Sequence, residues 1–198
     1  MSNLPHLPAA RKPRADAQRN RERILQVARA GFMQHGAAAS LDEIARRAGV
    51  GAGTLYRHFP TREALIEAVY HAEVNKLAEA GTRLQATLPA LDALRAWMLM
   101  FIDYVADKLL ILPALDTVAG GSARLIAGSR GPVHGTFLHL IRSAIESGDL
   151  ASDTNPEDIT RALIGTFHTT TMAGWEASAR RIVDLLLAGA SAHAGKPV

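Results

Sequence analysis

The chain has 198 residues, enough for one domain of moderate size or for a small domain attached to a larger one. Its composition, with 48% hydrophobic and 21% charged residues, is that of an ordinary globular protein. The absence of cysteine excludes disulfides, thiolate nucleophiles and cysteine metal sites. No apolar run approaches the roughly 20 residues that span a bilayer, and residues 1–14 lack the apolar core of a secretory signal. We therefore expect a cytoplasmic protein with no membrane partner.

The net charge of +3 hides an asymmetry along the chain. Residues 1–62 carry 11 Lys and Arg against 4 Asp and Glu, whereas residues 63–198 carry 11 against 15. A basic amino-terminal third on an acidic remainder is the distribution expected when one end of a protein meets a polyanion. A solvated basic face is the alternative, and charge alone does not separate the two interpretations.

Helical periodicity runs through the chain and strand-like alternation is not sustained, which predicts an all-α fold. Residues 1–16 hold three prolines and little that packs, so they are expected to form a flexible arm. The first helix is expected over 20–35, with Gly36 ending it in a left-handed conformation. The arm carries basic residues that could lie along a DNA groove, namely Arg11, Lys12 and Arg14.

A second short helix is expected to start at Ser40. Glu43, three residues later, completes a capping box in which each side chain accepts from the other residue's amide. Gly49 breaks this helix, and a third helix follows over 51–59. Pro60 prevents simple continuation of the third helix.

The fourth helix is expected to be capped by Thr61, with Glu63 near the positive end of its dipole. It should run to Ala80 and end at Gly81. These first helices form the amino-terminal unit, and a set of longer helices follows.

Pro89 opens a helix that is apolar on most sides and that Pro113 is expected to stop. Residues 114–130 are broken by glycines and should form one or two short helices with loops. Another helix is expected over 131–148.

Asn155-Pro156-Glu157-Asp158 is a strong helix start, with Asn as the cap, Pro in the first position and acids in the first turn. The helix that follows should reach Ala173 and end at Gly174. The last helix is expected over 175–190, and residues 191–198 are expected to be a disordered tail.

The two short helices over 40–59 are suited to reading DNA, because a helix in the major groove must approach closely enough for side chains to reach base edges. Glycine and alanine at the start of the second of them remove bulk and leave amides free for phosphate oxygens. Leu55 and Phe59, four residues apart, turn the other way and anchor it. The residues expected to contact DNA are Ser40, Arg46, Arg47, Gly51, Ala52, Gly53, Thr54, Tyr56, Arg57, His58 and Arg62.

Each of these residues also has an ordinary structural interpretation. Tyr56 could pack on the core, His58 could be a plain surface histidine, and Arg46 and Arg47 could be solvated helix charges. The Gly-x-Gly at 51–53 follows a helix rather than a strand and lacks the third glycine, so it does not indicate a nucleotide loop.

Three motifs, S-L-D-E-I-A-R-R-A-G-V at 40–50, G-T-L-Y-R-H-F at 53–59 and T-R-E-A-L at 61–65, resemble the tetracycline-repressor (TetR) family of bacterial regulators. The resemblance covers residues 17–77 and implies that they form a helix-turn-helix DNA-binding domain. It further implies that residues 78–190 form a helical domain that binds a ligand and dimerises through the last two long helices.

Carried over by position, the resemblance implies phosphate contact by Ser40, a place on the DNA face for Thr54, and backbone contacts by Tyr56 and His58. Arg62 would replace the lysine common at its place.

One departure from the family pattern matters. Gly51 and Ala52 stand where many members have serine followed by a polar residue. Base reading at those two positions is therefore reduced to shape or methyl contact. Thr54, Arg57 and Arg47 are left to carry more of the sequence discrimination.

The carboxyl-terminal region is expected to hold the effector site. The residues expected to face a ligand cavity are Trp97, Met100, Tyr104, His134, Phe137, His168, Thr171, Met172 and Trp175. For Trp97 and Phe137 core packing is the alternative, and for the polar run at 168–171 it is a satisfied internal network. His134 and His139, five apart, do not share a helix face, so neither a metal site nor a cofactor is expected.

Small residues recur along the expected 156–173 helix and favour close helix approach in a two-fold dimer. Two recognition helices about 34–36 Å apart would read the half-sites of a palindromic operator. The sequence therefore predicts a homodimeric repressor released from double-stranded DNA by an unknown small molecule. An activator, or a protein-interaction module without ligand gating, is the alternative. An enzyme is not expected, because cysteine is absent, the acids are dispersed and the histidines lack triad spacing.

Overall fold

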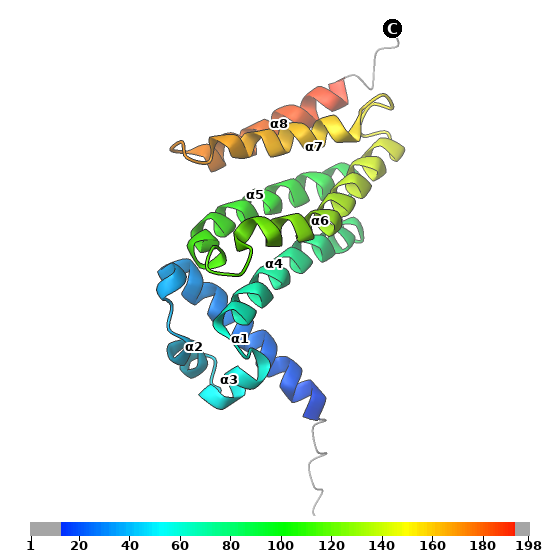
Figure 1. Cartoon of the computed structure of the whole chain (residues 1–198). Coiled ribbons are helices and arrows are strands. Elements are labelled where there is room, and N and C mark those ends of the chain that lie inside the picture. Colours follow the sequence, from blue (N-terminus) through cyan, green and yellow to red (C-terminus); the bar gives the residue numbers. More distant parts are fainter. Residues whose placement is uncertain (1–12, 193–198) are drawn as a thin grey trace, which may run out of the picture.

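The structure is a computed structural model that describes residues 13–192 (Figure 1). The parts of the expected arm and tail at 1–12 and 193–198 lie outside the described residues. Every regular element within 13–192 is helical, which confirms the all-α fold. The elements are α1 (Pro13–His35), η1 (Gly36–Ala38), α2 (Leu41–Arg47), α3 (Ala52–His58), α4 (Arg62–Gln85), α5 (Ala90–Leu115), α6 (Gly121–Glu146), α7 (Pro156–Gly165), η2 (Thr166–Thr169) and α8 (Trp175–Ala192).

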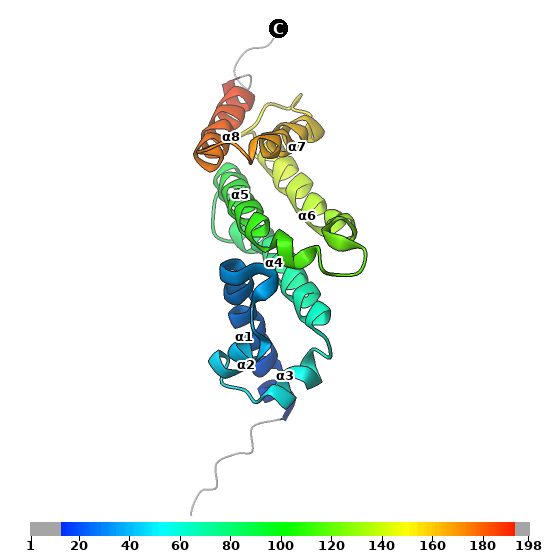
Figure 2. The same ribbon diagram turned by 60° about the vertical axis from the view of Figure 1, so that its left-hand side comes forward.

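The molecule is elongated, with α2 and α3 at one end and α7 and α8 at the other (Figures 1 and 2). Its apolar side chains form two cores that meet along α4, because Val74 belongs to the first core and Leu77 to the second. The first core lies among α1, α2, α3 and the first half of α4, and the second among α5, α6, α7 and α8. The expected division between 77 and 78 therefore falls inside a continuous helix.

The first core also takes side chains from the end of α5 and the start of α6. Ile111, Ala114 and Leu115 are buried in it, as is Leu125. The amino-terminal helices thus rest directly on the larger domain. None of the helices between residues 13 and 192 has the length and apolarity that a membrane span requires.

Two of the expected helix starts are confirmed by their caps. Thr61 Oγ1 accepts from the Ala64 amide at 3.1 Å, and Asn155 Oδ1 accepts from the Glu157 amide at 3.0 Å. Each side chain satisfies an amide that has no partner within its own helix.

The outer limits of the helices differ from expectation. α1 starts at Pro13 rather than at residue 20, so residues 13–16 are helical instead of belonging to a flexible arm. Proline is tolerated in the first turn of a helix, where its missing amide costs no hydrogen bond. At the other end α8 continues to Ala192, two residues into the expected tail.

Gly81 does not end α4, which runs on to Gln85. The glycine is buried where α4 crosses α6, and a Cβ added to it would overlap the Thr136 side chain. Gly81 is therefore a place of close helix packing rather than a helix terminator.

Pro113 does not stop α5, and the segment after it is not broken into short helices. α5 continues through Leu115, because Ala114 and Leu115 are buried in the first core and packing overrides the missing amide. α6 runs without interruption from Gly121 to Glu146, past Gly128 and Pro132.

The helix expected to reach Ala173 ends at Gly165, followed by the 3₁₀ turn η2. Threonine hydroxyls donate hydrogen bonds to backbone carbonyls there: Thr166 Oγ1 donates to Leu163 O at 2.7 Å and Thr169 Oγ1 to Thr166 O at 2.6 Å. Such local bonds compete with a regular helix. Gly174, in the left-handed region at φ +74°, then leads into α8.

Candidate nucleic-acid interface

The turn between α2 and α3 is closed by two backbone hydrogen bonds. The Gly49 amide donates to Arg46 O at 3.1 Å and the Val50 amide donates to Ala45 O at 3.0 Å, the paired pattern of a Schellman motif. Gly49 has φ +64°, which favours glycine. Val50 packs half-buried against the first core. These bonds hold α3 against α2 as a helix-turn-helix.

One of the two hydrogen bonds of the expected capping box is present at the start of α2. Ser40 Oγ accepts from the Glu43 amide at 3.3 Å. The Glu43 carboxylate, however, is bound by Arg46, from Nη2 to Oε1 at 2.7 Å and from Nε to Oε2 at 2.9 Å, rather than by the Ser40 amide. The hydrogen bond from Arg46 also lowers the pKa of Glu43. Arg46 thus already has an anionic partner, whereas Arg47 is exposed and makes no hydrogen bond within the described residues.

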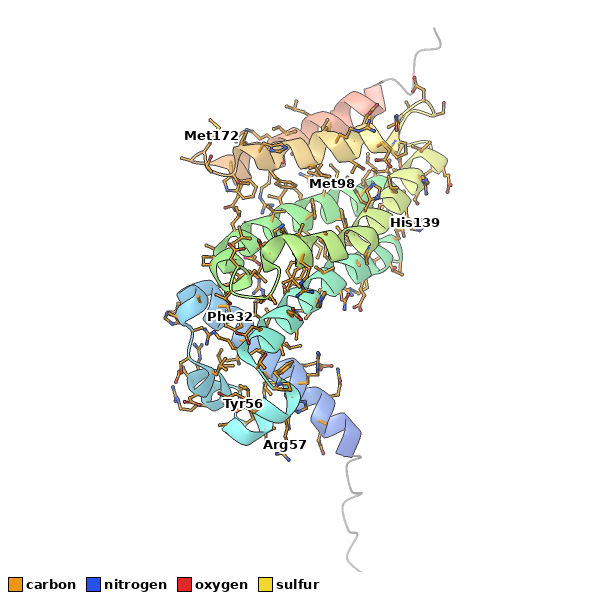
Figure 3. The ribbon with its side chains drawn as sticks, viewed as in Figure 1. Phe32, Tyr56, Arg57, Met98, His139 and Met172 are labelled. Atoms are coloured by element: carbon orange, nitrogen blue, oxygen red, sulfur yellow. The ribbon has the colours of Figure 1, made fainter. Side chains whose placement is uncertain are left out.

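One face of α3 is buried and the other is open. Leu55 is buried in the first core and Phe59, which follows the helix, is buried there too. On the opposite face Tyr56 is 46% exposed and Arg57 is exposed. Figure 3 shows both side chains on α3, at the end of the molecule farthest from α7 and α8. Tyr56 is therefore not a core residue.

The amino end of α3 has no side-chain cap and carries only small residues. Gly51 is its N-cap and provides no side-chain cap, and Ala52 and Gly53 are exposed. A Cβ added to Gly51 or Gly53 would meet nothing within 4 Å, and neither has a positive φ. The fold itself therefore does not require glycine at these positions.

Arg57 lies back along its own helix. Its Nε donates to Gly53 O at 3.2 Å and its Nη2 donates to Thr54 Oγ1 at 2.9 Å. Thr54 is half-buried. Two of the three side chains expected to carry the sequence discrimination are thus already in contact.

The last two expected contacts are tied into the fold. The half-buried His58 ring lies 6.2 Å from the Phe59 ring. Arg62 donates to Ala37 O, and its guanidinium carbon lies 5.7 Å from the centre of the Phe32 ring. Arg62 therefore joins the start of α4 to η1 and the end of α1.

The residues expected to face an effector do not gather around one cavity. Trp97 and Phe137 are buried in the second core, where their rings stack at 5.1 Å and Trp97 Nε1 donates to Leu77 O at 2.8 Å. His134 is exposed, and its Nε2 lies 3.5 Å from Glu157 Oε2. Trp175 is half-buried. The remaining exposed members are Met100, His168, Thr171 and Met172.

Some of the residues expected to face an effector line a small cavity or an open groove. Tyr104 lines a cavity of about 10 Å³ between α1, α4 and α5, room for a single water molecule. Burial raises the pKa of the Tyr104 hydroxyl, and its hydrogen bond with Tyr70 adds to the effect. Met172 and Trp175 line an open groove of about 380 Å³ between α7, η2 and α8. No charged side chain lines this groove.

One basic residue beside the recognition helix is not among the contacts expected from the sequence. The Arg21 guanidinium carbon on α1 lies 5.3 Å from the centre of the Phe59 ring. The two residues are far apart in the sequence, and no local pattern signals their contact.

Comparison with known proteins identifies this arrangement. Residues 24–69 match the family described as bacterial regulatory proteins, tetR family. The transcriptional regulator AcrR of Shigella flexneri is 34% identical over 157 residues, covering 71% of this chain and 73% of that protein. SrpR of Pseudomonas putida is 30% identical over 153 residues, covering 71% and 68%.

Solved structures agree over a larger part of the chain. The TetR regulator SCO0520 from Streptomyces coelicolor is 42% identical with a TM-score of 0.75, covering 86% of this chain and 98% of that one. A TetR regulatory protein from Mycobacterium vanbaalenii is 31% identical, also with a TM-score of 0.75, covering 91% and 99%. The chain therefore belongs to the TetR family of helix-turn-helix transcriptional regulators.

Proposed function

We propose that the protein is a homodimeric repressor that binds a palindromic operator through α3 and leaves it when a small molecule binds the larger domain. The observation that carries this proposal is the open face of α3. The core does not include Tyr56, Arg57 or residues 51–53, which are exposed. Together these positions suit a helix that enters the major groove.

Each part of this face has a distinct task. The missing side chains at Gly51 and Gly53 let the backbone approach a phosphate, and the free amides of the first turn favour an anion. Arg57 is the residue best suited to read a base, because its forked donors match the two acceptors of guanine. Tyr56 and Ser40 are expected to bind the backbone, which positions the helix without selecting sequence.

The opposite end of the molecule supports a dimer. α7 and α8 expose large apolar side chains: Ile164 is 49% exposed and Leu185 70%. A second copy packed on α7 and α8 across a two-fold axis would cover them. The two α3 helices would then face the two halves of a palindromic operator in the cytoplasm.

Release by a ligand requires that the ligand bind one arrangement of the dimer better than the other. Two features support a coupling between the ends. α4 runs from the helix-turn-helix into the second core, and the end of α5 is buried in the first core. The groove with Met172 and Trp175 is lined by no charged side chain, so it suits a neutral effector rather than an ion.

Salt dependence of duplex binding tests the DNA-binding part. Affinity should fall steeply between about 50 and 200 mM salt, because each neutralised phosphate contributes about −0.9 to the slope of log K against log salt. An absence of binding at low salt would favour a protein-interaction module. Transcription in vitro from a bound promoter then distinguishes a repressor from an activator. Adding the protein should lower transcription if it is a repressor and raise it if it is an activator.

A further inference from the structure

Arg21 is held against the carboxyl end of the recognition helix. It lies on α1, and its guanidinium carbon is 5.3 Å from the centre of the Phe59 ring, within the range of a cation–π contact. Phe59 directly follows α3, is buried, and donates its amide to Leu55 O at 2.8 Å. The ring is therefore rigid, and it fixes the cation beside α3.

Three nearby arginines, two on α1 and one at the start of α4, have acceptors within the described part of the protein. Arg19 is paired with Asp16, and Arg23 donates to Asn20 Oδ1 at 2.8 Å. Arg62 also lies over a phenylalanine ring, yet it donates to Ala37 O. These three guanidinium groups are therefore already hydrogen-bonded in the free protein.

Arg21 differs from them. It is half-buried, and among the side chains and backbone groups that the structure describes it has neither a hydrogen-bond acceptor nor an ion-pair partner. Contact with the face of the Phe59 ring does not consume any of the five N–H donors, which point outward in the plane of the group. A partly desolvated cation with free donors is suited to an anion that arrives from outside.

The position of Arg21 indicates which anion this is. The amino-terminal half of α1 lies beside α3 at the same end of the molecule in both views of the ribbon (Figures 1 and 2). A duplex whose major groove receives α3 would bring its phosphates past this point. The planar fork of arginine matches two oxygens of one phosphate.

We propose that Arg21 binds a backbone phosphate flanking the groove that α3 enters, and that Phe59 holds the guanidinium ready for it. This inference rests on the proposed DNA-binding function. The contact positions the recognition helix along the duplex and carries no base preference. It adds α1 to the DNA-binding surface, which the sequence placed only on residues 40–62 and on the arm.

Binding titrations of Arg21→Gln test the proposal. Arg142→Gln is the matched control, because Arg142 is an exposed arginine of α6 in the other domain. Arg21→Gln should weaken binding to operator and scrambled duplexes alike by roughly tenfold. It should also reduce the slope of log K against log salt by about 0.9, the contribution of one phosphate. Arg142→Gln should change neither quantity, and Arg21→Lys should keep the slope because the cation remains.

The outcomes separate this inference from the proposed function. If the unaltered protein binds no duplex at low salt, the function itself fails. If it binds with a steep salt slope and Arg21→Gln behaves like Arg142→Gln, only the Arg21 contact fails.

A purely structural role is tested on the unaltered protein, so a variant that folds poorly does not obscure the result. In a ¹⁵N spectrum the Arg21 Nε–H signal should shift and exchange more slowly with solvent when a duplex is added. An Arg21 signal as indifferent to the duplex as that of Arg142 would overturn the proposal.

Discussion

Arg57 Nη2 donates to Thr54 Oγ1 at 2.9 Å, one helical turn earlier on the open side of α3. The guanidinium that is best suited to read a base therefore lies along its own helix in the free protein. Reaching the groove requires exchanging this bond, and the one to Gly53 O, for bonds to DNA. Because Arg57 is exposed, water can replace these bonds and the net cost is about 1 kcal/mol each.

Arg57→Ala should lower the preference for the operator over a scrambled duplex by about 1–3 kcal/mol, the value of a good bidentate base contact. Affinity for the scrambled duplex should change little. Fluorescence titrations against both duplexes measure the difference. Equal losses on both would remove Arg57 as a base reader.

Tyr56→Phe should behave in the opposite way. The exposed hydroxyl is expected to bind a phosphate, so its loss should weaken binding to both duplexes by about 1 kcal/mol. The ring and its packing are retained, and thermal unfolding should be unchanged. A loss confined to the operator would assign Tyr56 to base reading instead.

Gly53→Ala should separate stability from binding. Alanine is favoured over glycine within a helix by about 0.5–1 kcal/mol, and the added Cβ meets nothing within the protein. The variant should unfold at a higher temperature yet bind DNA more weakly, since the methyl group occupies space needed by the duplex. Gly135→Ala in α6 is the control: its Cβ also meets nothing, so stability should rise while DNA binding stays constant. Undiminished binding by Gly53→Ala would show that the duplex does not approach there.

Arg29→Met should loosen the junction of the two domains. Arg29 Nε on α1 lies 3.1 Å from Glu73 Oε2 on α4, and the same guanidinium pairs with Asp107 on α5. Its loss removes the guanidinium that pairs with both partly buried carboxylates, although Lys76 still pairs with Glu73. We expect the free energy of unfolding to fall by about 1–2 kcal/mol, less than for a fully buried pair because all three groups are partly exposed.

Chemical denaturation measures this change. Asp107→Asn in the Arg29→Met background should recover part of the lost stability, because it removes the repulsion between the carboxylates. A double variant less stable than Arg29→Met alone would contradict this account of the junction.

Leu185→Glu should produce a monomer. Leu185 is an exposed leucine of α8, and a carboxylate there would be buried without a partner in the proposed dimer. Leu110→Glu is the control, since Leu110 is an exposed leucine on α5, outside α7 and α8. Sedimentation should show a dimer for the control and a monomer for Leu185→Glu, with operator affinity falling only in the monomer. A dimeric Leu185→Glu would move the interface elsewhere.

The helix-turn-helix could be predicted closely because its signals are local. Ser40 caps the helix that it precedes, Gly49 adopts the left-handed turn, and Leu55 and Phe59 share a face four residues apart. Each of these features depends on a few neighbouring residues.

The rest depends on partners that are distant in the sequence. Gly81 resembles a helix terminator until Thr136 is placed against it, and Pro113 resembles a stop until the first core closes over the residues that follow. The residues predicted to face an effector do not gather around one cavity for the same reason. Helical spacing does not reveal that Trp97 turns inward to Leu77 O rather than toward a cavity.

Selection of bound duplexes from a random pool shows both whether α3 reads DNA and whether two copies of the protein read it together. A dimeric repressor should enrich one sequence and its inverted repeat, with half-site centres about 10 base pairs or a multiple of that apart. A pool that stays random after repeated rounds, or that yields a single half-site without its repeat, would contradict this expectation.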